Sequence, residues 1–309
     1  MKAHSDEKQP LSEPPPVQAI GVLGAGTMGH GIAQVAAAAG FQVVLRDIDE
    51  GAVARGRQGI ERNLNRGIGR GKVTEAQRDE TLARIVTTTE LQNLSQVDLV
   101  IEAAPENLKI KQELLRECEA IANPHCIFAT NTSSLSITEI AGVAARPQNV
   151  IGMHFFNPVH IMKLIEIVVG ERTSADTTAA VRAIAVTMKK EPIVVRDVPG
   201  FASSRLGVTL GLEAMRMVEQ GVASARDIDT AMELGYNHPM GPLRLTDLVG
   251  LDVRLSIAEY LHSKLGSEAF RPPDILRRMV SEGNLGKKTG HGFYDWTDGD
   301  RARSAQPAS

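Results

Sequence analysis

Three glycines in the segment IGVLGAGTMG constrain the fold more than any other part of the chain. Their G-x-G-x-x-G spacing follows a predicted strand over 17–23 and precedes a predicted helix over 31–39. The first glycine allows a tight turn, the second lets backbone approach a pyrophosphate, and the third lets the helix pack closely on the strand. The N–H groups that begin the helix also favour phosphate. The segment therefore predicts a dinucleotide-binding turn formed by Gly24, Gly26, Thr27, Met28 and Gly29.

An acidic residue ends the next predicted strand, over 42–47, which is followed by a predicted helix over 51–66. Asp47 lies 47 − 24 = 23 residues after the first glycine, close to the spacing at which a carboxylate binds the ribose hydroxyls of adenosine. A carboxylate there repels the 2′-phosphate of NADP, so the pattern favours NAD. The neighbouring Arg46 would soften that preference, and a glycine-rich turn that binds no nucleotide is the alternative interpretation.

Short β-branched segments alternate with helical patterns through the first part of the chain, which is typical of a parallel sheet covered by helices. Further strands are predicted over 99–102, 127–131, 150–154 and 165–169, with helices over 110–121 and 177–188. We therefore expect an α/β fold with a Rossmann-type, doubly wound and mainly parallel sheet of six or more strands.

Helical patterns alone follow the turn at Pro199-Gly200, with helices predicted over 201–220, 224–235, 242–265 and 273–282. This change predicts an all-helical C-terminal domain whose thin core suits packing against a partner or a second copy. The expected division is a flexible tail over 1–16, an NAD-binding domain over 17–198, a helical substrate and dimerisation domain over 199–297, and a flexible tail over 298–309.

Charge and apolar content exclude several classes of protein. The chain has 34 basic and 37 acidic residues, a formal charge of −3, so it lacks a general basic field that would attract nucleic acids or anionic lipids. No apolar stretch reaches the roughly 20 residues that a membrane crossing needs. The start of the chain lacks the features of a signal or transit peptide, and Cys118 and Cys126 are too few for a disulfide framework. We expect a cytoplasmic protein that binds neither nucleic acid nor membrane.

A histidine in the segment GMHFFNP ends another predicted strand, where ligand sites of open α/β sheets lie. His154 is followed twelve positions later by Glu166. An imidazole held by a carboxylate can remove a hydroxyl proton while hydride leaves the same carbon. A hydrogen-bonded packing histidine is the alternative. The other histidines show no spacing typical of metal ligands, so we expect no metal site.

Polar residues at two further strand ends are weaker candidates for contacts with substrate or cofactor. Ser133, in the segment NTSS, is placed to meet a substrate oxygen, although Ser136 and Glu139 form a capping-box pattern and the cluster would serve equally to begin a helix. Glu102 and Glu106 stand with Lys111 where the LVIE strand turns into a helix. These charged residues either line the cofactor site or are exposed to solvent.

Arg70 and Lys72 form a local basic loop within the segment RGIGRGK. A solvated turn is the simplest interpretation. The functional alternative is a seat for an anionic tail, such as the phosphates of coenzyme A.

Taken together, GAGTMGHGIAQ, NTSSLSIT, GMHFFNP, MKLIEIV, HPMGP and GKKTGHGFYDW resemble the L-3-hydroxyacyl-CoA dehydrogenase family. The resemblance runs from about residue 17 to 296 and is strongest to the free-standing 3-hydroxybutyryl-CoA dehydrogenases. It implies NAD in the first domain, an acyl-CoA substrate, a role in fatty-acid metabolism such as β-oxidation, and a homodimer formed by the helical domain.

The same resemblance implies roles for individual residues. His154 corresponds to the catalytic base and Glu166 to its partner, while Ser133 and Asn157 contact substrate or nicotinamide. Contacts with the cofactor are implied for Glu106, Lys111 and Lys288.

One position departs from the family pattern. The family often has P-G-F-x-x-N-R at the start of the helical domain, and this chain has PGFASSR, which places Ser204 at the asparagine position.

The predicted activity is NAD-dependent, reversible oxidation of (3S)-3-hydroxyacyl-CoA to 3-oxoacyl-CoA. The alternatives are a dehydrogenase of a free hydroxy acid or sugar acid, a non-catalytic NAD-binding scaffold, and a component of a multifunctional fatty-acid-oxidation system.

Overall fold

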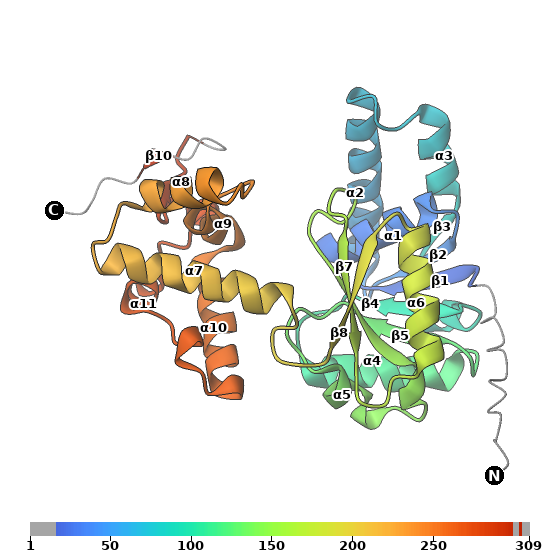
Figure 1. Cartoon of the computed structure of the whole chain (residues 1–309). Helices are drawn as coiled ribbons and strands as arrows, with labels where there is room; N and C mark the ends of the chain where they lie inside the picture. Colours follow the sequence, from blue (N-terminus) through green and yellow to red (C-terminus); the bar gives the residue numbers. More distant parts are fainter. Residues whose placement is uncertain (1–16, 299–302, 305–309) are drawn as a thin grey trace, which may run out of the picture. The chain divides into compact units, whose positions relative to one another are not determined.

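The computed structural model describes residues 17–298 and 303–304, and the chain divides into two compact units between Asp197 and Val198. The first unit is built on an eight-stranded sheet with the order β3-β2-β1-β4-β5-β6-β7-β8 (Figure 1). The strands are β1 (Ala19–Leu23), β2 (Gln42–Arg46), β3 (Ile85–Thr88), β4 (Leu99–Glu102), β5 (Ile127–Thr130), β6 (Val150–Phe155), β7 (Leu164–Val169) and β8 (Glu191–Arg196). All neighbouring strands are parallel except β6 and β7. The predicted doubly wound, mainly parallel sheet is confirmed.

Helices cover both faces of this sheet. They are α1 (Thr27–Ala38), α2 (Glu50–Gly69), α3 (Glu75–Ala83), α4 (Leu108–Ile121), α5 (Ile137–Ile140) and α6 (Ala175–Thr187), with short 3₁₀ turns η1 (Leu91–Leu94), η2 (Ala141–Val143) and η3 (Pro147–Asn149). Helices α1, α2 and α6 share one apolar core with the strand residues that face them. On the opposite face, α5 packs against Gly152, where an added Cβ would meet Ile137 at 2.9 Å. The α4 and α5 helices lie on the same side of the sheet in Figure 1.

Two features of the strand order position the functional residues. The order reverses between β1 and β4, and in open α/β sheets ligands bind outside the carboxyl ends of the strands at such a point. The chain between β6 and β7 is only residues 156–163, and a parallel crossover needs about a dozen residues or more. Strand β7 therefore runs antiparallel and pairs directly with β6.

The structure differs from the sequence prediction at several elements. Helix α1 begins at Thr27, four residues before the predicted start, while α3, β3 and β8 were not predicted. The predicted helix over 242–265 is two helices, because Gly250 lies at φ +104°, a left-handed conformation that ends an α-helix and that glycine adopts readily. The predicted tail over 1–16 lies outside the described residues, as does most of the tail over 298–309.

The second unit is helical, as predicted. It contains α7 (Ser203–Glu219), α8 (Ala225–Gly235), α9 (Pro242–Val249), α10 (Leu251–Leu265) and α11 (Asp274–Ser281), with 3₁₀ turns η4 (Glu268–Phe270) and η5 (Lys287–Thr289) and a small pair of strands, β9 (Tyr294–Asp295) and β10 (Arg303–Ser304). Its apolar core joins residues of α7, α8 and α10 to the closing aromatic segment. Among the described residues, no helix combines the length and apolar character that a bilayer crossing requires.

Buried Asp247 of α9 anchors the closing motif of this unit, GKKTGHGFYDW. Its carboxylate accepts hydrogen bonds from the N–H groups of Phe293 and Tyr294 at 3.0 and 2.9 Å and from the indole Nε1 of Trp296 at 2.9 Å. Burial raises the pKa of Asp247 despite these donors. An added Cβ at Gly292 would lie 2.2 Å from the same carboxylate, which explains this glycine in the motif.

We expect Asp247→Ala to destabilise the helical unit by about 4 kcal/mol, since three buried donors lose their acceptor. Denaturant unfolding followed by the fluorescence of Trp296, the single tryptophan, measures this loss. Asp252→Ala is the control, because Asp252 is 39% exposed and pairs with Lys288 at the surface, where an ion pair contributes about 1 kcal/mol or less. Equal losses for the two variants would contradict the role of Asp247.

Candidate active site

The glycine turn after β1 has the geometry that a dinucleotide requires. Gly24 has φ +93°, and an added Cβ would lie 2.7 Å from the carbonyl oxygen of Ala103. At Gly29 an added Cβ would lie 1.6 Å from the carbonyl oxygen of Gly24, whereas the space beside Gly26 is open. Helix α1 begins at Thr27 without a side-chain cap or an acidic residue in its first turn. Its first N–H groups and the open position at Gly26 fit a diphosphate.

Asp47 lies directly beside this turn. One carboxylate oxygen accepts from the N–H of Ala25 at 2.6 Å, and the other accepts from the N–H of Ile48 at 2.7 Å. The side chain thus stands at the carboxyl end of β2, next to the start of α1, where the adenosine ribose of a dinucleotide lies. The neighbouring Arg46 donates through Nε to the carbonyl oxygen of Thr89 at 3.1 Å. Together the turn and Asp47 fit NAD.

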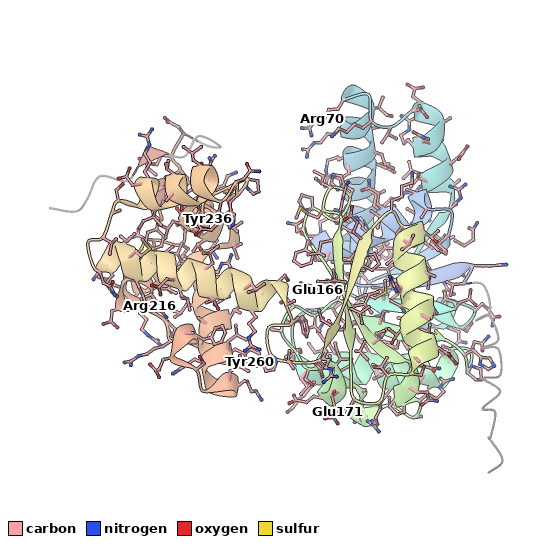
Figure 2. All side chains as sticks on the ribbon, viewed as in Figure 1. Arg70, Glu166, Glu171, Arg216, Tyr236 and Tyr260 are labelled. Carbon is pink, nitrogen blue, oxygen red and sulfur yellow. The ribbon has the colours of Figure 1, made fainter. Side chains whose placement is uncertain are left out.

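The antiparallel pairing of β6 and β7 places His154 opposite Glu166. The imidazole Nδ1 lies 2.7 Å from Oε2 of Glu166, and the side chains are 9% and 0% exposed, respectively. The carboxylate therefore fixes the ring and favours the tautomer with its proton on Nδ1. The ring of Phe156 lies against the imidazole, with 4.5 Å between ring centroids. Figure 2 labels Glu166 within the sheet.

The loop after β5 is held by the carboxylate of Glu106. Its Oε1 accepts from the hydroxyl of Thr132 at 2.6 Å, from the N–H of Ser133 at 3.1 Å and from the hydroxyl of Ser134 at 3.1 Å. Burial raises the pKa of Glu106, but the charge of Lys111 and these donors outweigh burial and lower it. Ser136 caps α5 by accepting from the N–H of Glu139, so the serine cluster both begins a helix and presents Ser133.

Two neighbouring positions have roles that sequence reasoning missed. Asn131 accepts from the N–H of Phe155 at 2.8 Å and so ties the end of β5 to the end of β6. Lys111, predicted to contact the cofactor, is fully buried and its ammonium lies 2.8 Å from Glu102 and 3.4 Å from Glu106. Nothing in the residue pattern distinguishes such a buried lysine from a solvated one.

A groove of about 850 Å³ connects Asn157 with the basic loop predicted to bind an anionic tail. It runs along α1 between the α2–α3 pair and the segment 157–163, and both Arg70 and Lys72 line it. Arg70 lies at the far end of α2 (Figure 2). The charged lining residues comprise one acid, Glu80, and the cations Arg66, Arg70, Lys72, Arg84, Lys163, Lys189 and Lys190.

The titration of His160 reports on the charge of this groove. Burial lowers its pKa, and so do the nearby positive or protonatable side chains of Lys190, His30 and Arg66. Burial disfavours a charge of either sign, whereas the cations of Lys190 and Arg66 favour an anion.

Ser204 and Lys288 belong to the second unit. Ser204 is half-buried in the first turn of α7. Lys288, in η5, is exposed and its ammonium contacts both carboxylate oxygens of Asp252 at 2.5 and 2.6 Å. Both residues therefore belong to a different unit from His154.

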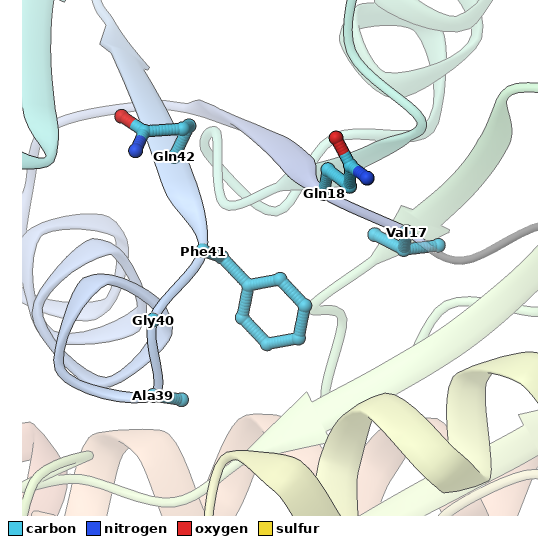
Figure 3. A pocket seen from close by; sticks show the side chains of 6 residues that line it. All are labelled: Val17, Gln18, Ala39, Gly40, Phe41 and Gln42. Atoms are coloured by element: carbon cyan, nitrogen blue, oxygen red, sulfur yellow. The ribbon is translucent and has the colours of Figure 1, made fainter.

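A second hollow lies at the opposite end of the strands. It has a volume of about 350 Å³ and sits where β1 and β2 begin (Figure 3). Its lining holds no titratable side chain and consists of Val17, Gln18, Ala39, Gly40, Phe41 and Gln42. Within residues 17–298, no group of three or more His, Cys, Asp or Glu side chains is arranged to hold a metal ion.

Comparison with known proteins identifies the group to which this architecture belongs. The family profile described as 3-hydroxyacyl-CoA dehydrogenase, NAD binding domain, matches residues 19–198, and the profile of the C-terminal domain of the same family matches residues 200–296. The chain belongs to the 3-hydroxyacyl-CoA dehydrogenase family. It is an NAD-dependent oxidoreductase of this family, so the predicted family, cofactor and reaction class are confirmed.

Individual relatives cover almost all of the chain. The probable 3-hydroxybutyryl-CoA dehydrogenase of Bacillus subtilis is 47% identical over 282 residues, which are 91% of this chain and 98% of the relative. The 3-hydroxyadipyl-CoA dehydrogenase of Escherichia coli is 41% identical over 281 residues, which are 91% of this chain and 59% of the relative. The crystal structure of (S)-3-hydroxybutyryl-CoA dehydrogenase from Ralstonia eutropha has a TM-score of 0.88 and 43% identity, covering 91% of this chain and 99% of that one.

We expect Asp47→Ser to weaken the binding of NADH by the dehydrogenase about 10- to 100-fold. A charge-assisted hydrogen bond contributes about 1.5–3 kcal/mol, and the ribose hydroxyls would lose it. Binding of NADPH should change much less, because the repulsion of its 2′-phosphate is lost as well. Fluorescence titration with both cofactors measures the two changes.

Asp49→Ser is the matched control for Asp47→Ser. Asp49 lies two residues further on and caps α2 by accepting from the N–H of Ala52, a role that serine also fills. Cofactor affinity should stay unchanged in this control. Equal losses for NADH and NADPH in Asp47→Ser would show that Asp47 does not contact the ribose.

Proposed function

We propose that the enzyme reversibly oxidises short-chain (3S)-3-hydroxyacyl-CoA, with (3S)-3-hydroxybutyryl-CoA as the main substrate, and that His154 is the base. The observation that carries the proposal is the 2.7 Å contact between Nδ1 of His154 and the fully buried carboxylate of Glu166. The names of the B. subtilis and R. eutropha relatives support the short acyl chain.

The arrangement of the pair suits a coupled transfer of proton and hydride. Bound NAD supplies a hydride acceptor at its nicotinamide ring. With Nδ1 held by Glu166, Nε2 of His154 takes the proton of the 3-hydroxyl group as the hydride leaves C3. The Glu166 carboxylate stabilises the imidazolium that forms, and in the reverse direction the imidazolium returns the proton to the 3-oxo group.

Three further residues are proposed to contact the reacting groups. Ser133 is presented by the loop that Glu106 holds, and Asn157 is exposed two residues beyond the end of β6. Ser133 follows β5 and Asn157 follows β6, at the carboxyl edge of the sheet on the β4 side of the glycine turn, where the nicotinamide half of the cofactor and the substrate are expected. Ser204 takes the position of an asparagine in the family pattern and is proposed to donate a hydrogen bond to the substrate oxygen.

His154→Gln should lower kcat by about 10² to 10⁴ while the affinity for NADH stays within about twofold, because the base is removed and the glycine turn is untouched. Steady-state reduction of acetoacetyl-CoA and titration with NADH measure the two quantities. Glu166→Gln should lower kcat less than His154→Gln, since the base remains but its imidazolium loses a charged partner. A His154→Gln enzyme with full activity would refute the proposed base.

The groove between α1, the α2–α3 pair and segment 157–163 is proposed to hold the phosphate-bearing part of coenzyme A. Its excess of cations favours the anionic tail, and Arg70 and Lys72 line the same groove as Asn157. Arg70 and Lys72 are both exposed, so each can turn toward a phosphate without breaking a buried contact.

Arg70→Ala combined with Lys72→Ala should raise KM for acetoacetyl-CoA about tenfold and leave kcat nearly unchanged. The two side chains are proposed to bind the phosphates equally well in the ground state and in the transition state, so their loss weakens substrate binding alone. The same double variant should show an unchanged KM for acetoacetyl-pantetheine, which lacks the nucleotide phosphates. Arg182→Ala, on α6 outside the lining of the groove, is the control. An equal rise in KM for both thioesters would contradict this seat for coenzyme A.

An apolar stripe on the second unit supports the homodimer. Leu245, Leu248 and Val249 of α9 are each about 40% exposed and recur at the spacing of one helix face. Val253 of α10 and Tyr236, labelled in Figure 2, are also exposed. The homodimer, the cytoplasmic location and a role in β-oxidation stay predictions.

A further inference from the structure

A buried array of charges lies beneath the active site, and its central pair belongs to none of the proposed catalytic steps. The ammonium of Lys111 lies 2.8 and 3.0 Å from the two carboxylate oxygens of Glu102. Both side chains are 0% exposed. Glu102 also accepts from the hydroxyl of Thr130 and from the N–H of Ala104, each at 2.6 Å. A buried pair that is so fully hydrogen-bonded keeps a fixed geometry.

The array continues from this pair to the surface of the site. The second carboxylate, that of Glu106, lies 3.4 Å from the Lys111 ammonium and is 37% exposed. Glu106 in turn holds the loop that presents Ser133. Two carboxylates thus share one ammonium, and the array carries a net charge of −1.

The register of the sheet places this array near the reacting groups. Glu102 pairs with Thr130, and Thr130 pairs with Gly152. His154 lies on the same face of the sheet as Gly152, two residues or about 7 Å nearer the carboxyl edge. A dinucleotide with its diphosphate at the glycine turn and its adenosine ribose at Asp47 would extend its nicotinamide half over the ends of β4 and β5. Glu102 is the last residue of β4, and Glu106 lies four residues beyond it.

The nicotinamide ring changes charge in the reaction, since it is cationic in NAD⁺ and neutral in NADH. A fixed negative charge near its site therefore favours the oxidised form. We propose that the net charge of −1 carried jointly by Glu102, Lys111 and Glu106 raises the affinity of the enzyme for NAD⁺ relative to NADH.

This inference rests on binding of NAD and on neither the proposed base nor the acyl-CoA substrate. Titrations with the two cofactor forms need no thioester and no turnover. Failure of the proposed function and failure of this inference are therefore separate results.

Glu102→Gln removes one negative charge and almost no volume, so it tests the charge directly. A unit charge acting over about 10 Å at an effective dielectric constant of about 40 changes an equilibrium roughly fourfold. We expect the ratio of Kd for NAD⁺ to Kd for NADH to rise about three- to tenfold, measured by NADH fluorescence and by its displacement with NAD⁺. A loosened site without any charge effect would weaken both forms equally and would overturn the proposal.

Two matched variants separate charge from packing. Glu102→Gln combined with Lys111→Gln restores the net charge of −1, carried by Glu106, and should return the ratio to within about twofold of wild type. Asp98→Asn removes a carboxylate at the amino end of β4, where Asp98 accepts from the N–H groups of Gln18 and Ala19, and should leave the ratio unchanged. A double variant with a larger shift than the single one, or an equal shift in Asp98→Asn, would contradict the proposal.

Glu106→Gln provides a second route if Glu102→Gln does not fold. It removes the same charge at the partly exposed end of the array and keeps the buried pair of Glu102 and Lys111 intact. The ratio should again rise in the direction expected for Glu102→Gln. An unchanged ratio in a folded Glu106→Gln enzyme would overturn the inference.

Discussion

The close pairing of parallel strands β1, β4, β5 and β6 is the constraint on which the active site depends. Parallel strands end at one edge of a sheet, so the turns that follow them converge there although they are far apart in the sequence. The glycine turn follows β1, Glu106 follows β4, Ser133 follows β5 and Asn157 follows β6. Glu106 and Asn131 tie these turns together by hydrogen bonds to the loop and strand beside them. The site is therefore assembled by the sheet and not by any single loop.

One departure from the parallel pattern brings together the proposed base, His154, and its carboxylate partner, Glu166. The short connection after β6 forces β7 to return antiparallel, and this register sets Glu166 beside His154. Both side chains project from the interior of a hydrogen-bonded sheet, where a strand residue has little freedom to move. The buried carboxylate thus orients the imidazole before substrate binds. The same short connection carries Asn157 and one wall of the basic groove.

Strong local patterns made much of the fold and site predictable. The glycine spacing, the β-branched segments and the acidic residue at the end of β2 are each visible in the sequence, and each predicts one local structure. The Glu102–Lys111 pair was left undecided, because charged side chains are rarely fully buried and only the folded sheet brings these two together. Strand β3 was missed because two of its four residues are exposed and its pattern resembles a loop. The break at Gly250 was missed because glycine is tolerated inside helices. Only its backbone angle φ, which the sequence does not display, distinguishes a glycine within a helix from one that ends it.

We propose that this site transfers hydride between NAD and the C3 position of a coenzyme A thioester. The most direct test is oxidation of NADH by the wild-type enzyme with acetoacetyl-CoA, compared with free acetoacetate and with NADPH as the alternative cofactor. We expect rapid oxidation of NADH that requires the thioester and is much slower with NADPH. Equal rates with free acetoacetate, or no turnover by an enzyme that binds NADH, would contradict the account.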